Sequence, residues 1–153
     1  MPHDRPFLIW ALRRTGGAAF AALLQQASSH PTLTHEPFNR DRIHGGLTRD
    51  WGDMPDVARL RRGIEAVLAP LPTIKHCYEV VPLPLNAALL KAANARGYHH
   101  ILLTRAAEID RLFSLEVASL TGAWGPENAG AIFDDIRAGR RPAPELGWRK
   151  TVN

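Results

Sequence analysis

Strand-like and helix-like segments alternate along this chain, and the alternation limits the folds open to it more than any other feature. Short apolar runs with strand character cover residues 7–12, 33–36, 73–81 and 98–104. Segments with helical composition or period cover residues 18–28, 56–68, 85–96, 108–120 and 127–138. Strands that alternate with helices are typical of a parallel sheet with helices on both faces. The sequence therefore predicts a three-layer α/β protein.

The length of the chain predicts a single domain over residues 1–153, because a chain of this size can bury a real core. Residues 38–55 are rich in Arg, Gly, Asp and Asn, and we expect a mobile loop or lid there with few buried contacts. Residues 139–153 are rich in Pro, Gly and Arg and predict an irregular tail.

The formal net charge of +4 comes from scattered basic residues, mostly arginine pairs. No basic stripe with interleaved aromatic residues is present, so the charge predicts no nucleic-acid partner, and a basic cleft for a small polyanion explains it equally well. No apolar run reaches membrane-spanning length, so no membrane span is expected. The lone Cys77 and an N-terminus without the layout of a signal peptide make the cytoplasm the expected location.

The turn after the first apolar run is the strongest candidate for a binding site. Between residues 7–12 and the helix-prone segment from Ala18, the turn consists of Arg13, Arg14, Thr15, Gly16 and Gly17. The first N–H groups of a helix are positive and lack internal partners, glycines allow close approach of a phosphate, and an arginine adds a charged fork. The pattern GxxxxGK[ST] is absent, so the lysine and the magnesium-binding hydroxyl of a nucleoside-triphosphate loop are missing. We expect an anion bound without metal; the open alternative is a turn whose glycines serve backbone geometry alone.

Two other strand ends carry polar candidates. Glu36 lies at the end of the second strand, and Arg105 follows the fourth, with Ser114 in the next helix. In a parallel sheet these ends share one edge with the glycine turn, which predicts one crevice. A carboxylate there can act as general base for an alcohol, and Arg105 with Ser114 can hold a second phosphate. The alternatives are a cap or salt bridge for Glu36, an ion pair of Arg105 with Glu108, and a serine packed within its helix.

Two histidine-containing pairs, His76-Cys77 and His99-His100, do not predict a metal site. Neighbouring residues on a strand point to opposite faces, so neither pair can chelate as a unit. No spacing of the zinc type is present either. We therefore expect no metal.

Four pieces of the sequence follow one another in order: Arg14-Thr15-Gly16-Gly17; His35-Glu36-Pro37-Phe38-Asn39; Leu103-Thr104-Arg105 with Arg111-Leu112-Phe113-Ser114-Leu115; and Ala118-Ser119-Leu120-Thr121-Gly122-Ala123-Trp124. Together, over residues 7–124, the chain resembles the bacterial sulfotransferase family, and within it the branch similar to trehalose 2-sulfotransferase. The first piece looks like the family's 5′-phosphosulfate loop, and the second like its Glu-Pro element. The third looks like the Arg…Ser element that holds the 3′-phosphate, and the fourth like the stretch after that serine.

The resemblance implies a P-loop NTPase-like sulfotransferase fold and the donor 3′-phosphoadenosine 5′-phosphosulfate, with no metal. It implies in-line transfer of a sulfuryl group to a hydroxyl of a sugar, lipid or small alcohol, and it leaves a homodimer open. In this interpretation Arg14 and the loop amides neutralise charge on the leaving phosphate, and Glu36 takes the acceptor's proton. The implied donor-binding residues are Arg13, Arg14, Thr15, Gly16, Gly17, Ala18, Arg105 and Ser114.

Two departures keep a second function open. Gly17 and Ala18 stand where the family usually has hydroxyl residues, and the chain is short, with only Arg149 and Lys150 to suggest the family's basic C-terminal segment. These departures favour a non-catalytic nucleotide- or polyanion-binding protein that keeps the fold. Retention of the Glu-Pro and Arg…Ser elements favours the enzyme. The missing P-loop lysine argues against a third alternative, an ATP- or GTP-dependent kinase.

Overall fold

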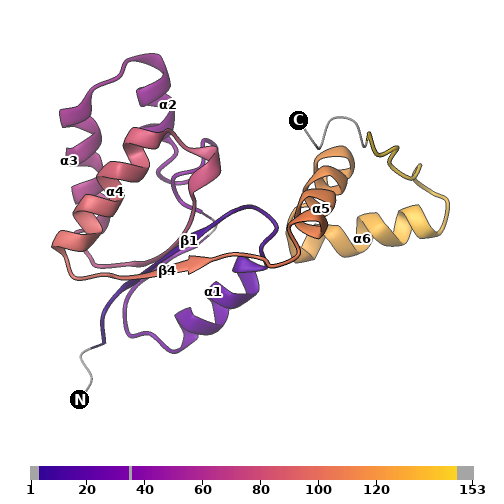
Figure 1. Cartoon of the computed structure of the whole chain (residues 1–153), viewed down its shortest axis with the longest axis horizontal. Coiled ribbons are helices and arrows are strands. Elements are labelled where there is room, and N and C mark those ends of the chain that lie inside the picture. The colour runs from indigo at the N-terminus through magenta and orange to yellow at the C-terminus, as the bar shows by residue number, and fades with distance from the viewer. Residues whose placement is uncertain (1–3, 35, 148–153) are drawn as a thin grey trace. The chain divides into compact units, whose positions relative to one another are not determined.

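A computed structural model describes residues 4–34 and 36–147 of the chain, except the side chains of residues 126 and 127. The chain divides into two compact units, Met1–Thr104 and Arg105–Asn153. The first unit contains a four-stranded sheet (Figure 1). The second contains two helices. The single domain expected over residues 1–153 stays a prediction.

The sheet of the first unit is parallel throughout. Its strands, in spatial order, are β2 (Thr32–Leu33), β3 (Thr73–Cys77), β1 (Phe7–Ala11) and β4 (His99–Leu103). In the register of the two central pairings, Ile9 lies opposite Lys75 on β3 and opposite Ile101 on β4. The predicted α/β class with a parallel sheet is confirmed.

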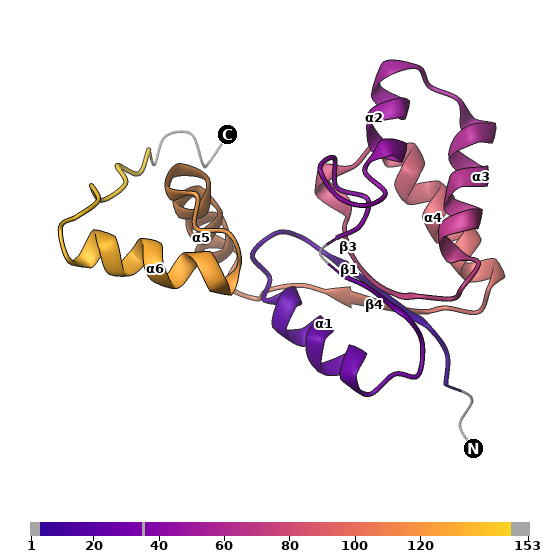
Figure 2. The same ribbon diagram turned by 180° about the vertical axis from the view of Figure 1, so that it is seen from behind.

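Helices flank both faces of this sheet, as Figures 1 and 2 show from opposite sides. Helix α1 (Gly17–Gln26) covers one face, and α3 (Val57–Leu68) and α4 (Leu83–Ala95) cover the other. Successive side chains of a strand alternate between the two faces of its sheet. Strand β1 therefore contributes to the hydrophobic core on each face: Ile9 packs with Ala21 of α1, and Leu8 packs with α3 and α4.

Two expected strands differ clearly in extent from the structure. The second strand is expected over 33–36 but covers only Thr32–Leu33. The third is expected to reach residue 81 but ends at Cys77, where the 3₁₀ helix η1 (Tyr78–Val80) begins. Glu36 therefore lies beyond β2 and not on its last residue.

Residues 38–55 are not the open loop that the composition suggests. They contain helix α2 (Gly46–Asp53), and Phe38 is completely buried. The hydroxyl of Thr48, which is also buried, donates to the Phe38 carbonyl at 2.6 Å. A side chain at Gly45 would overlap the Arg40 carbonyl, so this glycine permits a close backbone turn. The expectation of few buried contacts is wrong for this segment, because the burial of Phe38 holds it in place although most of its other residues are polar. A lid function stays a prediction.

The second unit consists of α5 (Glu108–Thr121), α6 (Gly125–Arg137) and a tail. Helix α5 ends at Gly122, whose φ of 75° suits a glycine C-cap. Residues 141–147 form neither helix nor strand, and Arg149 and Lys150 lie outside the described residues, so the irregular tail over 139–153 stays a prediction. Within the described part of the chain, no helix is long and apolar enough to cross a membrane.

His76 is a titratable group in the main core. It has no exposed surface, and its Nε2 lies 2.6 Å from Oδ1 of Asn86. Trp10 and Phe38 pack edge-on against its ring, with centroids 5.2 and 5.7 Å away. Burial lowers the pKa of His76 to about 4, against smaller opposing effects of Asn86 and Glu36. The imidazole is therefore neutral at neutral pH.

We predict that this burial makes the protein less stable as the pH falls from about 6.5 to about 4. The unfolded histidine binds a proton near 6.5 while the folded one binds it only near 4, so the unfolded state holds more protons across this window. The free energy of unfolding should fall by up to roughly 3 kcal/mol from this group alone. Urea unfolding across the window should show a shallower pH dependence for His76→Gln than for wild type, whereas exposed His99→Gln should match wild type. Equal slopes for His76→Gln and wild type would contradict the prediction.

Candidate anion-binding site

The turn between β1 and α1 has an unusual backbone. Arg14 has φ 65° and Gly16 has φ 81°, and the Thr15 hydroxyl closes the turn by donating to the Leu12 carbonyl at 2.9 Å. A positive φ is routine for glycine but uncommon for arginine, and such residues often occur at functional sites. Two left-handed residues with one residue between them turn the chain sharply from the end of the strand into the helix.

Helix α1 begins at this turn without a capping side chain. Gly16 is the N-cap, and the first turn contains no acidic residue. Since the first N–H groups of a helix have no internal acceptor, this end of α1 is suited to an external anion. Gly17 is buried, and a Cβ added there would lie 2.8 Å from Cε of Lys75 and 3.2 Å from Cδ2 of Leu103. The first turn of the helix therefore rests directly on the sheet.

Lys75 is not among the site residues predicted from the sequence, but it lies against two of them in the structure. It lies in the middle of β3, on the same face of the sheet as its partner Ile9, and its stem passes under Gly17. Its Nζ forms an ion pair with Oε1 of Glu36. The signal in the sequence is a charged residue inside the otherwise uncharged stretch Thr73–Cys77, because lysine in a buried strand needs a partner.

Glu36 is held at both oxygens. Oε1 pairs with Lys75, and Oε2 accepts from Nδ2 of Asn39 at 3.0 Å. The Glu36 backbone has φ 54°, and its carbonyl accepts from the Asn39 N–H at 3.0 Å. A salt bridge of Glu36 is the alternative that the sequence leaves open, with a nearby arginine such as Arg40 or Arg42 as the expected partner; in the structure the partner is Lys75. His35 lies outside the described residues. A role of Glu36 as base stays a prediction.

A second carboxylate also reaches the turn. Oε1 of Glu79, in η1, accepts from the Arg13 N–H at 2.5 Å and from its Nε at 3.0 Å. Because β3 and β1 are neighbours, the residues that follow them meet at the same edge of the sheet. The turn thus already binds a carboxylate of its own chain through one amide and one guanidinium, and sequence spacing alone gives no signal for this pairing.

Cys77 lies beside these charges but is not a reactive thiol. It is buried, and its Sγ lies 3.8 Å from Oε1 of Glu79. Burial, with the nearby carboxylates of Glu36 and Glu79, raises the pKa of the thiol to about 12. It therefore stays protonated at neutral pH and offers no nucleophile.

Arg105 and Ser114 belong to the second unit. Nη2 of Arg105 lies 3.9 Å from Oδ2 of Asp110. Glu108 accepts from Arg111, with Nε at 2.9 Å from Oε1, and these hydrogen bonds lower the pKa of Glu108. Both the phosphate role of Arg105 and its alternative, an ion pair with Glu108, stay predictions. That Arg105 and Ser114 line one crevice with the turn 13–17 stays a prediction.

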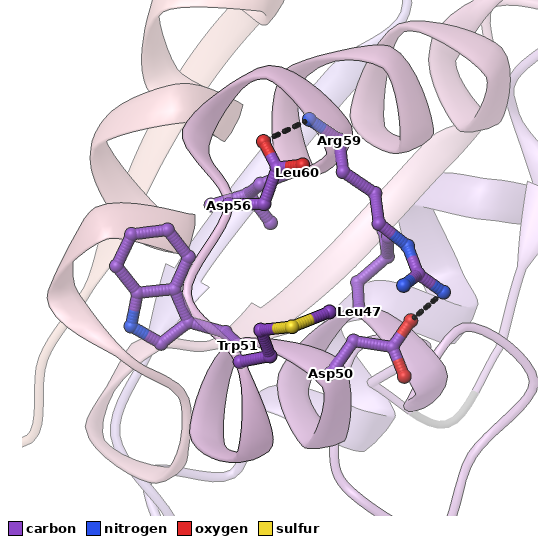
Figure 3. A pocket seen from close by; sticks show the side chains of 7 residues that line it. Leu47, Asp50, Trp51, Asp56, Arg59 and Leu60 are labelled. Carbon is purple, nitrogen blue, oxygen red and sulfur yellow. Dashed lines mark hydrogen bonds and ion pairs between the residues drawn. The ribbon is translucent and has the colours of Figure 1, made fainter.

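A small cavity of the first unit lies between α2 and α3, and none of the candidate site residues lines it (Figure 3). Arg59 spans it, with Nη2 2.6 Å from Oδ2 of Asp50 and its backbone N–H 2.9 Å from Oδ1 of the helix cap Asp56. The free space is about 10 Å³, room for about one water. The contacts around the cavity connect α2 to α3, and the cavity itself is too small for an organic ligand. Among the described residues, no group of three or more His, Cys, Asp or Glu side chains is placed to hold a metal ion.

Comparisons with models of known protein families, with curated proteins and with solved structures find no match to this chain. The function must therefore be inferred from the site itself. In the first unit the structure brings together the turn 13–17, Glu36 and Lys75, through the contacts of the lysine with both.

Proposed function

We propose that this protein is a sulfotransferase with a P-loop-like fold, acting on an acceptor hydroxyl with 3′-phosphoadenosine 5′-phosphosulfate as the donor. The observation that carries the proposal is the uncapped start of α1, which follows directly on a turn with two arginines and two left-handed residues. This arrangement is suited to a phosphate or sulfate group bound by backbone amides. The cytoplasm as the location is part of the same proposal.

The donor's 5′-phosphosulfate would lie on the turn. The amides of Gly16, Gly17 and Ala18 and the guanidinium of Arg14 would face the oxygen that becomes the leaving phosphate. Fixed dipoles and charges aimed at the place where negative charge develops are usually the largest contribution to catalysis. Arg105 and Ser114 would hold the 3′-phosphate.

Glu36 would accept the proton of the acceptor hydroxyl as that oxygen attacks sulfur. Its left-handed backbone is supported by Asn39, so the carboxylate has a fixed position near the lysine that also touches α1. A positioned carboxylate of this kind is a suitable general base. The acceptor would be a sugar, a lipid or a small alcohol.

A second candidate function is a non-catalytic nucleotide- or polyanion-binding protein. The charge pairing around the turn favours it, since Glu36 is bound to Lys75 and Glu79 to Arg13. Gly17 and Ala18 also supply no hydroxyl to the donor. This alternative keeps anion binding but removes proton transfer.

We predict that 3′-phosphoadenosine 5′-phosphate binds without magnesium and more tightly than AMP. The extra phosphate gains charged hydrogen bonds to Arg105, which corresponds to about 10- to 150-fold in affinity. Calorimetric titration in the presence of a chelator should show this preference, and Arg105→Ala should remove most of it. Arg61→Ala, an exposed arginine of α3, is the matched control. Equal affinity for both nucleotides in wild type would reject the 3′-phosphate site.

We predict that Glu36→Gln lowers turnover by about 10²–10⁴-fold without weakening binding of the nucleotide product, because glutamine keeps the shape but cannot take a proton. The measurement is transfer of labelled sulfate from the donor to a panel of sugars and alcohols, with exposed Glu145→Gln as the control. Unchanged turnover of the folded Glu36→Gln fraction would assign Glu36 a structural role. If wild type sulfates no acceptor in the panel but binds the nucleotide, the binding-protein alternative holds.

A further inference from the structure

Lys75 touches two parts of the proposed site at once. Its Nζ pairs with the Glu36 carboxylate, and its Cε lies where a side chain at Gly17 would have to go, under the first turn of α1. Both members of the pair are mostly buried, with 15% of the lysine side chain and 22% of the glutamate side chain exposed. A lysine is seldom buried within a strand unless its charge is paired, because removing the ammonium from water is costly.

We propose that Lys75 exchanges partners in the reaction cycle: it holds Glu36 when the donor site is empty and turns to the anionic donor when that site is filled. This inference rests on the proposed function. It assigns Lys75 as a donor-binding residue and as the residue that controls when Glu36 is released as a base.

The resting pair explains why a release step is needed. One oxygen of Glu36 is engaged by Lys75 and the other by Asn39, so an acceptor hydroxyl would have to share Oε1 with the ammonium and Oε2 with the amide. When the ammonium leaves, Oε1 becomes accessible while Asn39 still fixes the carboxylate. An acceptor alcohol can then donate its hydrogen bond to Oε1 without competition from the ammonium, so the base is released only after the donor has bound.

In this cycle the sulfuryl group moves in line from the donor to the acceptor hydroxyl. The acceptor oxygen forms a bond to sulfur and its proton passes to Oε1 of Glu36. The bond between sulfur and the bridging oxygen breaks, and its electron pair stays on the 5′-phosphate of the leaving nucleotide. The ammonium of Lys75 would stabilise that new charge beside the amides of α1, as a charge placed where the transition state needs it.

The chemistry of lysine suits this exchange. Its ammonium is a compact charge on a flexible four-carbon stem, whereas a guanidinium is a planar fork with fixed directions. The stem already lies against Gly17, so rotation about the last side-chain bonds would carry Nζ from Glu36 toward the start of α1. The lysine that is absent from the turn in the sequence is thereby supplied by the neighbouring strand β3.

The test is calorimetric titration of 3′-phosphoadenosine 5′-phosphate into the full chain and into four variants: Glu36→Gln, Lys75→Met, the double variant of both, and Lys75→Arg. Lys91→Met, an exposed lysine of α4, is the control. Lys75→Met should weaken binding at least about 10-fold, since a charged interaction is lost. Glu36→Gln should tighten binding about 2- to 5-fold, because the competing carboxylate is gone, and it should have no such effect when Lys75 is also replaced. Lys75→Arg should bind within a few-fold of wild type.

Three results would overturn the exchange. In the first, Glu36→Gln leaves the affinity unchanged. In the second, it tightens binding equally with and without Lys75. In the third, Lys75→Met binds as well as wild type. Each leaves the donor site itself intact, whereas failure of wild type to bind the nucleotide at all rejects the proposed function and the exchange together. Thermal melting of each variant identifies loss of fold, and the double variant avoids an unpaired buried charge if Lys75→Met is unstable.

Discussion

The first turn of α1 lies so close to the sheet that position 17 has no room for a side chain unless Lys75 moves. This contact fixes how the chain leaves β1, since the turn from Ala11 to Gly17 must cross to the helix within a few residues and does so through the left-handed Arg14 and Gly16. It also sets the electrostatics of the site, because it brings the stem of a lysine from β3 beneath the positive end of the helix. The arrangement of the turn, the helix end and the lysine follows from this one packing constraint.

Charges around the turn are balanced within the chain. Arg13 is bound to Glu79 and Lys75 to Glu36, so the cations that would attract a donor already have anionic partners. Under the proposed function a donor would compete with these carboxylates, which would lower its affinity but couple its arrival to the release of a base. The two carboxylates would then be part of how the site works, and their presence would not argue against an anion as ligand.

The α/β class, the parallel sheet and most helices were predictable, because hydrophobic period and strand length are local signals. The helical period predicts a helix over residues 56–68, and in the structure Asp56 caps α3 while Leu60, Ile64 and Leu68 form its buried face. Helix α2 was not predictable from composition, since its polar sequence is held by the burial of Phe38 and Thr48. The same limit applies to the site: the glycine turn is visible in the sequence, whereas the pairs of Glu36 with Lys75 and Arg13 with Glu79 join residues far apart and depend on the strand order.

The start of α1 is the proposed binding site of the anionic donor, and an amide-resolved NMR titration of the full chain with 3′-phosphoadenosine 5′-phosphate tests this directly. We expect the N–H signals of Gly16, Gly17 and Ala18 to shift progressively and to saturate with the calorimetric affinity, while those around Lys91 on α4 do not change. Saturable binding that leaves the three amides unshifted would place the donor elsewhere.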